Sequence, residues 1–332
     1  MADSAHVWPD PDWETTSPAA VGLSESVLAS TTAVLKRPGS NVSAYLVIRS
    51  GRIAWEQYFD GVRSAHRHPL FSITKSVISA LVGIAVQEKH LKSVDQLVAE
   101  FFPEFPLDSA NPLGQLTVRH LLTMTCGLVW PRIGWGREPM VERMRKSPDW
   151  AHFILGVPVR RQEIGTFHYT SAASHLLSAI LTRVTGQSAC DYARSRLFAP
   201  LGIQEVAPGS DWESDPTYNS LGGWGLHLSA RELARFGWLY ACKGLWQNQA
   251  VVTAGWIEES TQRVNGIHTV YGYQWWLREM HGERIIAGLG VGGQFLFCVP
   301  DRELVVVILS RFIHHWPDRW EILNELLARG VS

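Results

Sequence analysis

Two stretches of the sequence carry apolar residues around most of each helical turn. Residues 73–86 are apolar on almost every side, and residues 170–184 form a second strongly apolar run. Helices with this pattern are buried inside a protein rather than lying on its surface. Shorter runs rich in β-branched and aromatic residues predict strands instead. The candidate strands are 43–48, 52–59, 271–277, 284–287, 294–299 and 303–309.

These strands fall into two groups near opposite ends of the chain. Ser50-Gly51 lies between the first two strands and predicts a hairpin, and Pro300-Asp301 marks a turn in a C-terminal antiparallel meander. Neither group has enough strands to be stable alone, so we expect both to join in one antiparallel sheet. Predicted helices at 24–36 and 316–329 would cover a face of that sheet.

Between the two strand groups the sequence predicts mainly helices. Besides the two apolar runs, N-cap signals stand at Thr117, Ser188 and Ser229, the last within the capping box Ser229-Ala-Arg-Glu232. We therefore predict an α+β protein with two domains. Residues 1–70 and 262–332 would form an α/β domain, residues 71–261 a mainly helical domain, and the active site would lie in the cleft between them.

The composition narrows the range of functions. The chain has 332 residues, 46% of them hydrophobic and 18% charged, with a net charge of −1. This balance gives no electrostatic footprint for nucleic acid or for an anionic membrane. The acidic start has no apolar signal-peptide core, and no apolar run reaches spanning length. The four cysteines show no metal or redox spacing, so we expect a thiol-reduced, cytoplasmic protein.

Candidate chemistry is concentrated where the first apolar helix begins. Ser72 and Lys75 form an S-x-x-K unit there, and residues three apart lie on one face of a helix. A serine hydroxyl is a weak nucleophile until a nearby base takes its proton. Burial and the positive end of a helix both disfavour the charged form of a lysine. The competing interpretation is that Ser72 merely caps the helix.

Other motifs carry less information. His66-x-His68 provides two candidate metal ligands, but nothing nearby in the sequence completes a set, so we expect no metal site. The glycine-rich run 288–293 precedes a predicted strand rather than a helix, which excludes a nucleotide-binding loop. We therefore expect no cofactor. Of the 15 tryptophans, most should be core residues, but three in irregular, glycine-rich segments are candidates to line a substrate pocket: Trp130, Trp135 and Trp224.

Several segments, in the same order, resemble the class C β-lactamase-related serine hydrolases. This group includes penicillin-recognising enzymes, family VIII esterases and 6-aminohexanoate-dimer hydrolases. The resemblance implies a β-lactamase/transpeptidase-like fold, with an antiparallel sheet flanked by N- and C-terminal helices and an all-helical insert. The matching segments are 72–76, 116–128, 167–188, 199–203, 225–237 and 290–301.

The resemblance also assigns roles to individual residues. The family motif Y-x-N reads Tyr169-Thr170-Ser171 here, which implies that Tyr169 is the general base and that Ser171 replaces an asparagine. A tyrosine needs a cationic neighbour to act as a base near neutral pH, because its ordinary pKa is about 10. Ser171 can still form a hydrogen bond with Lys75, but it cannot offer an amide to a substrate carbonyl.

A third family motif consists of a basic residue, one further residue and a glycine on a strand. Its predicted counterpart is Val291-Gly292-Gly293, followed by Gln294. The two glycines would permit close approach of a ligand to the strand. The backbone N–H of Gln294 would be the second oxyanion donor, beside that of Ser72. A glycine-rich bulge without a catalytic role explains the pattern locally nearly as well.

The predicted function is that of a cofactor-free serine hydrolase that cleaves a small ester or amide through an acyl-enzyme. A β-lactamase or D-Ala-D-Ala-peptidase-like activity and a non-catalytic binding protein are the alternatives. The partner would be a small molecule, with neither nucleic acid nor membrane, and the oligomeric state is left open. Because Val291 is apolar, we expect uncharged substrates to be preferred to β-lactams, unless an arginine such as Arg284 binds the carboxylate.

Overall fold

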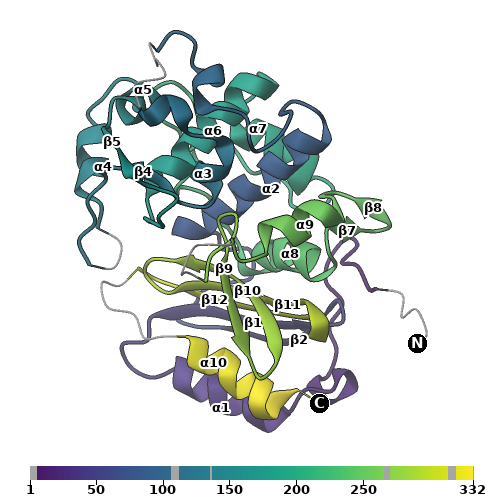
Figure 1. Ribbon diagram of the computed structural model, residues 1–332. Coiled ribbons are helices and arrows are strands. Elements are labelled where there is room, and N and C mark those ends of the chain that lie inside the picture. Colours follow the sequence, from purple (N-terminus) through teal and green to yellow (C-terminus); the bar gives the residue numbers. More distant parts are fainter. Residues whose placement is uncertain (1–5, 106–111, 135–136, 265–269, 313–318, 332) are drawn as a thin grey trace.

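The computed structural model describes residues 6–105, 112–134, 137–264, 270–312 and 319–331, and its centre is an antiparallel sheet (Figure 1). The sheet has six strands in the order β2-β1-β12-β11-β10-β9. Its neighbours β1 and β12 come from opposite ends of the chain and pair antiparallel. The predicted joining of the two strand groups in one sheet is therefore confirmed. The strands are β1 (Val42–Arg49), β2 (Arg52–Tyr58), β9 (Trp276–Met280), β10 (Glu283–Gly290), β11 (Gln294–Val299) and β12 (Leu304–Ser310).

Helices cover both faces of the sheet. The first and last helices, α1 (Glu25–Leu35) and α10 (Trp320–Glu325), lie side by side on one face (Figure 1). On the other face lies α8 (Ala230–Ala241), whose Gly237 faces Leu296 and Val305 so closely that a methyl group there would lie 2.7 Å from each. α8 falls within the predicted helical domain, 71–261, although it packs on the sheet.

The remaining helices form the second part of the molecule, around α2 (Thr74–Gln87). This helix is buried from Thr74 to Ala85 and packs against α6 (Ser171–Thr185), as expected for the two apolar runs. The other helices are α3 (Val118–Leu122), α4 (Pro139–Met144), α5 (Trp150–Leu155), α7 (Ala189–Ala193) and α9 (Ala254–Ser260). Three short strand pairs join the loops: β3 (His68–Pro69) with β6 (His227–Leu228), β4 (Cys126–Leu128) with β5 (Val159–Ile164), and β7 (Leu245–Trp246) with β8 (Gln249–Ala250).

The segment before β9 differs from the predicted strand 271–277. Gln274 has a φ of 62°, and its side chain donates to the backbone oxygens of Leu121 and Leu122 at the end of α3. It also accepts a hydrogen bond from Ser174 of α6. This amide fixes a turn in the chain and delays the start of the strand to Trp276.

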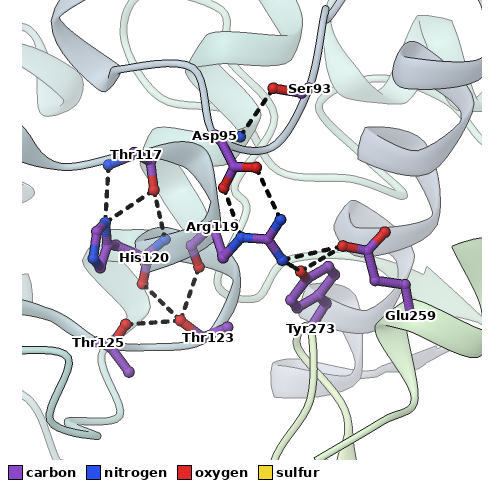
Figure 2. Close-up of polar contacts among 9 residues, drawn as sticks. All are labelled: Ser93, Asp95, Thr117, Arg119, His120, Thr123, Thr125, Glu259 and Tyr273. Atoms are coloured by element: carbon purple, nitrogen blue, oxygen red, sulfur yellow. Dashed lines mark hydrogen bonds and ion pairs between the residues drawn. The ribbon is translucent and has the colours of Figure 1, made fainter. Parts of the chain in front are cut away.

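A polar cluster joins α3 to α9 and to the same turn, as Figure 2 shows. Arg119 of α3 donates to Asp95, to Glu259 and to the hydroxyl of Tyr273. These charged side chains are 39% to 64% exposed, so the ion pairs contribute little to stability individually. These contacts connect α3 with three other segments, which are the loop at Asp95, helix α9 at Glu259 and the turn at Tyr273. In the described part of the chain, no helix has the length and apolar character to cross a membrane.

Candidate active site

Ser72 lies in a short 3₁₀ turn, Phe71–Ile73, that leads into α2. Phe71 has a φ of 47°, a strained conformation for an aromatic residue. The turn is anchored because Leu70 N–H donates to the backbone oxygen of Leu226. Ser72 caps no helix: its hydroxyl oxygen instead accepts a hydrogen bond from Lys75. The competing interpretation of Ser72 as a helix cap is thereby removed.

Lys75 is the hub of the site. Its side chain is buried, with 1% of the residue exposed, and its Nζ donates to three oxygens. These are Ser72 Oγ at 2.9 Å, Ser171 Oγ at 3.3 Å and the backbone oxygen of Gly223 at 2.6 Å. The three N–H groups of an ammonium are therefore all used, and none of the acceptors is charged. The predicted proximity of Ser72, Lys75 and Ser171 is present in the structure.

The Gly223 carbonyl is a part of the site that the sequence analysis missed. A methyl group on Gly223 would lie 2.8 Å from Ser171 Cβ. The loop that contains Gly223 can therefore pack this closely against α6 only if position 223 is a glycine. The preceding loop is held by Asp215, whose Oδ2 lies 3.0 Å from His175 Nε2 of α6 in a fully buried pair. The only signal in the sequence was the pair Gly222-Gly223.

Tyr169 lies beside Lys75, directly before α6. Its ring centroid is 5.0 Å from Lys75 Nζ, and its ring stacks on Trp276 at 5.6 Å. The Arg132 guanidinium lies on the same ring, with Cζ 4.7 Å from the centroid. Among the described residues, the Tyr169 hydroxyl forms no hydrogen bond with Lys75 or Ser72. Burial, with a smaller contribution from Tyr169, raises the pKa of neighbouring Tyr271 well above its usual value.

Glu138 is a second component that the sequence analysis missed. Its carboxylate accepts hydrogen bonds from Ser171 N–H at 2.9 Å and from the Ser171 hydroxyl at 2.9 Å. It also accepts one from the indole N–H of Trp130 at 2.7 Å. Glu138 is half-buried and directly precedes α4, in a segment whose residue pattern contains no signal of this contact.

The predicted third motif lies at the turn between β10 and β11. Val291, Gly292 and Gly293 form the turn, and the two glycines have φ values of 84° and 96°. The preceding residue, Gly290, faces the Leu70 backbone oxygen so closely that no side chain fits between them. The end of β10 therefore lies against the turn that carries Ser72.

The direction of the Gln294 backbone follows from the strand register. Antiparallel pairs alternate between those that exchange backbone hydrogen bonds and those that do not. Leu277 of β9 donates its N–H to the Val270 oxygen, away from β10, so Leu277 and Ile286 are a pair without mutual hydrogen bonds. The backbone N–H and C=O of Ile286 are therefore directed towards Cys298 of β11. Gly290 lies four residues after Ile286, so the alternation makes Gly290–Gln294 a hydrogen-bonded pair as well. The N–H of Gln294 is therefore directed at the Gly290 oxygen. This engagement argues against Gln294 as an oxyanion donor.

The Gln294 side chain is also engaged. It is fully buried, donates to the Ser310 backbone oxygen at 2.9 Å and accepts from Ser310 N–H at 3.0 Å. The same alternation directs the N–H groups of Leu289 and Val291 towards the β9 side of β10. Because β9 pairs with β10 only as far as Ala287, this edge has no strand partner in the described structure.

The other candidate residues are divided between the site and more distant places. Trp130 is buried against Glu138, and half-buried Trp224 follows Gly223 directly. Trp135 lies outside the described residues. Arg284 pairs in the sheet with Glu279. The rings of His66 and His68 are 4.7 Å apart, and no group of three or more metal-binding side chains exists among the residues that the structure describes.

Comparisons with known proteins agree with this architecture. A solved class C β-lactamase from Rhodobacter sphaeroides is 18% identical, with a TM-score of 0.70 over 92% of this chain and 99% of that one. A penicillin-binding protein homologue from Caulobacter crescentus is also 18% identical, with a TM-score of 0.69 over 97% and 98%. At these identities the likeness shows the fold alone.

Sequence comparison goes further. The chain is 26% identical over 315 residues to a 6-aminohexanoate-dimer hydrolase from Paenarthrobacter ureafaciens, covering 87% of this chain and 77% of the relative. The family model described as Beta-lactamase matches residues 32–319. Because that match includes most of the chain, the protein belongs to the beta-lactamase family and is a serine hydrolase.

Proposed function

We propose that Ser72 is the nucleophile of a cofactor-free hydrolase that forms an acyl-enzyme. The observation that carries this proposal is the 2.9 Å hydrogen bond between Lys75 Nζ and Ser72 Oγ, made by a lysine with 1% exposure. As Oγ attacks the substrate carbonyl, its proton passes to the amine of Lys75. The charge that develops on the carbonyl oxygen then requires backbone donors.

The oxyanion donors we propose are the N–H of Ser72 and an N–H at the end of β10. Leu289 and Val291 direct their N–H groups towards the open edge of this strand, whereas the Gln294 N–H faces the Gly290 oxygen. This assignment replaces the one expected from the sequence. A structure of the phosphonylated protein would test it. The phosphonyl oxygen should lie within about 3 Å of the Ser72 N and of Leu289 N or Val291 N.

Tyr169 would complete the proton transfer and activate water in the second half-reaction. Its ring centroid lies 5.0 Å from Lys75 Nζ, and the hydroxyl would approach the lysine in the substrate complex. Catalytic hydrogen bonds often shorten only in the substrate complex.

The substrate we propose is a small ester or amide. The relative named as a hydrolase of the 6-aminohexanoate dimer supports a test with a linear amide. Purified protein should be incubated with p-nitrophenyl esters, linear amides and nitrocefin. This panel separates an esterase or amidase from a β-lactamase, and turnover of none of these substrates supports the non-catalytic alternative.

Labelling with a fluorophosphonate, followed by peptide mass spectrometry, locates the nucleophile. Label on Ser72, and loss of ester turnover in Ser72→Ala, are the expected results. Ser79→Ala is the matched control, because Ser79 is a buried serine of the same helix whose hydroxyl has no hydrogen-bond partner among the described residues. Label on another residue, or equal turnover in Ser72→Ala and the parent, would refute the assignment.

A further inference from the structure

We propose that Glu138 is a positioning residue that directs the amine lone pair of Lys75 towards Ser72. It acts through Ser171, which lies between the two. Glu138 Oε1 is 2.9 Å from Ser171 Oγ, and Ser171 Oγ is 3.3 Å from Lys75 Nζ. The inference rests on the proposed function, in which Lys75 accepts the proton of Ser72.

The direction of each hydrogen bond follows from the groups involved. A carboxylate can only accept, so the single proton of the Ser171 hydroxyl points to Glu138. Towards Lys75, Ser171 Oγ can then present only lone pairs. The backbone oxygen of Gly223, 2.6 Å from Lys75 Nζ, is an acceptor as well. Two neighbours of Lys75 are therefore fixed as acceptors.

This arrangement determines where a neutral Lys75 directs its lone pair. A neutral amine has two N–H groups and one lone pair. If the N–H groups are donated to Ser171 and Gly223, the lone pair is left facing Ser72 Oγ at 2.9 Å. The Ser72 proton then moves to Lys75 as Oγ bonds to the carbonyl carbon. The resulting ammonium donates its three N–H groups to the same three oxygens.

A glutamine at position 138 would remove this direction. Its amide group has the same shape but can donate to Ser171 Oγ. The Ser171 hydroxyl is then free to donate to the lone pair of Lys75, in competition with Ser72. The geometry of the site would remain, while the population of the reactive arrangement would fall.

The experiment uses the full chain and p-nitrophenyl butyrate. Glu138→Gln should lower the acylation rate about 10- to 100-fold with KM changed less than about threefold. The double variant Glu138→Gln/Ser171→Ala should be no slower than Ser171→Ala, because Glu138 acts through Ser171. Glu138→Asp keeps a group that can only accept and should recover much of the rate.

Glu142→Gln is the matched control. Glu142 belongs to the same segment but is exposed and faces Arg137 at 3.8 Å. A Glu138→Gln variant with the parent rate would overturn the inference, as would additive losses in the double variant. If the parent itself fails to acquire fluorophosphonate on Ser72, the proposed function fails instead, so the two failures are distinguishable. Circular dichroism of each variant identifies a loss of folding.

Discussion

At the scale of single residues, the buried lysine explains most of the site. A charged group out of contact with water is unfavourable unless hydrogen bonds replace its hydration. Lys75 has three oxygen acceptors, and these come from the turn before α2, from α6 and from the loop that contains Gly223. Each of these segments must therefore be in place before the lysine can be buried.

Lys75→Ala and Tyr169→Phe should each reduce kcat by about 10²–10⁴, the usual effect of removing a positioned acid–base group. The loss in the double variant should be much smaller than the product of the two, because both residues handle one proton. Steady-state kinetics on one ester and one amide, with thermal melts to confirm folding, would measure this. Near-parent activity of Tyr169→Phe on both substrates would exclude Tyr169 as the base.

The residues found from the sequence were those within recognisable local motifs: Ser72 with Lys75, and Tyr169 with Ser171. Glu138 and Gly223 were not predicted as site residues, because both lie in irregular segments where no spacing rule connects them with their partners. The role of Gln294 as an oxyanion donor stays a prediction, which the strand register disfavours. The direction of its N–H depends on the parity of the β10–β11 register, which the residue pattern does not reveal.

At the scale of elements, helix and strand existence followed the apolar pattern closely. Both apolar runs became buried helices, and the hairpin and meander became strands of the sheet. Boundaries were less predictable where a side chain bonds to a distant backbone. Gln274 is the clearest case, because its amide binds the end of α3 and so interrupts the expected strand.

Two helical glycines make a matched test of how α8 packs. Gly255 in α9 is exposed, and a methyl group added there would have no atom of the described residues within 4 Å. Gly255→Ala should therefore raise the free energy of unfolding by about 0.5–1 kcal/mol. At Gly237 the added methyl meets Leu296 and Val305 at 2.7 Å. The resulting overpacking should outweigh the gain in helix propensity, so Gly237→Ala should lower that free energy by about 1–3 kcal/mol.

Urea denaturation of both variants would give the two values. Equal stabilisation by the two substitutions would contradict the close packing of α8 on the sheet. The sequence placed this helix within the predicted helical domain, 71–261, although the helix packs on the sheet. Its capping box and its apolar face are visible in the sequence, but the surface that covers the apolar face is not.

At the scale of the whole molecule, the sequence predicts that the two strand groups join in one sheet, because neither group has enough strands to be stable alone. Which strands would meet was not predictable in the same way. The pairing of β1 with β12, and the position of β9 at the edge, depend on how the helices pack on both faces.

The stability of the whole protein should depend on pH through Asp215. Burial alone would raise the pKa of this carboxyl, but hydrogen bonds from His175 and Asn219 outweigh it and hold the pKa below its usual value. A lowered pKa means that the stabilisation is present above the unfolded value of about 3.9 and is lost as the pH falls below it.

Asp215→Asn should therefore destabilise the protein at pH 5, by about 2–4 kcal/mol, because it weakens a buried polar network. The difference in Tm between variant and parent should shrink at pH 3, because below about 3.9 the unfolded carboxyl binds a proton that the folded carboxyl, with its lowered pKa, resists. Calorimetry at the two pH values measures this, with the exposed Asp301→Asn as control. A Tm difference that is constant between pH 5 and pH 3 would contradict the assigned pKa direction.

The pairing of β1 with β12 has a consequence for biosynthesis. A ribosome releases the chain from its N-terminus, so β1 and β2 emerge long before their neighbour β12 has been made. During that interval the edge of β1 opposite β2, which will pair with β12 at Tyr45, Leu46 and Val47, has no strand partner within the nascent chain. An unpaired apolar strand edge is a template for aggregation. The nascent protein should consequently depend on holding chaperones until synthesis of the last strands is complete.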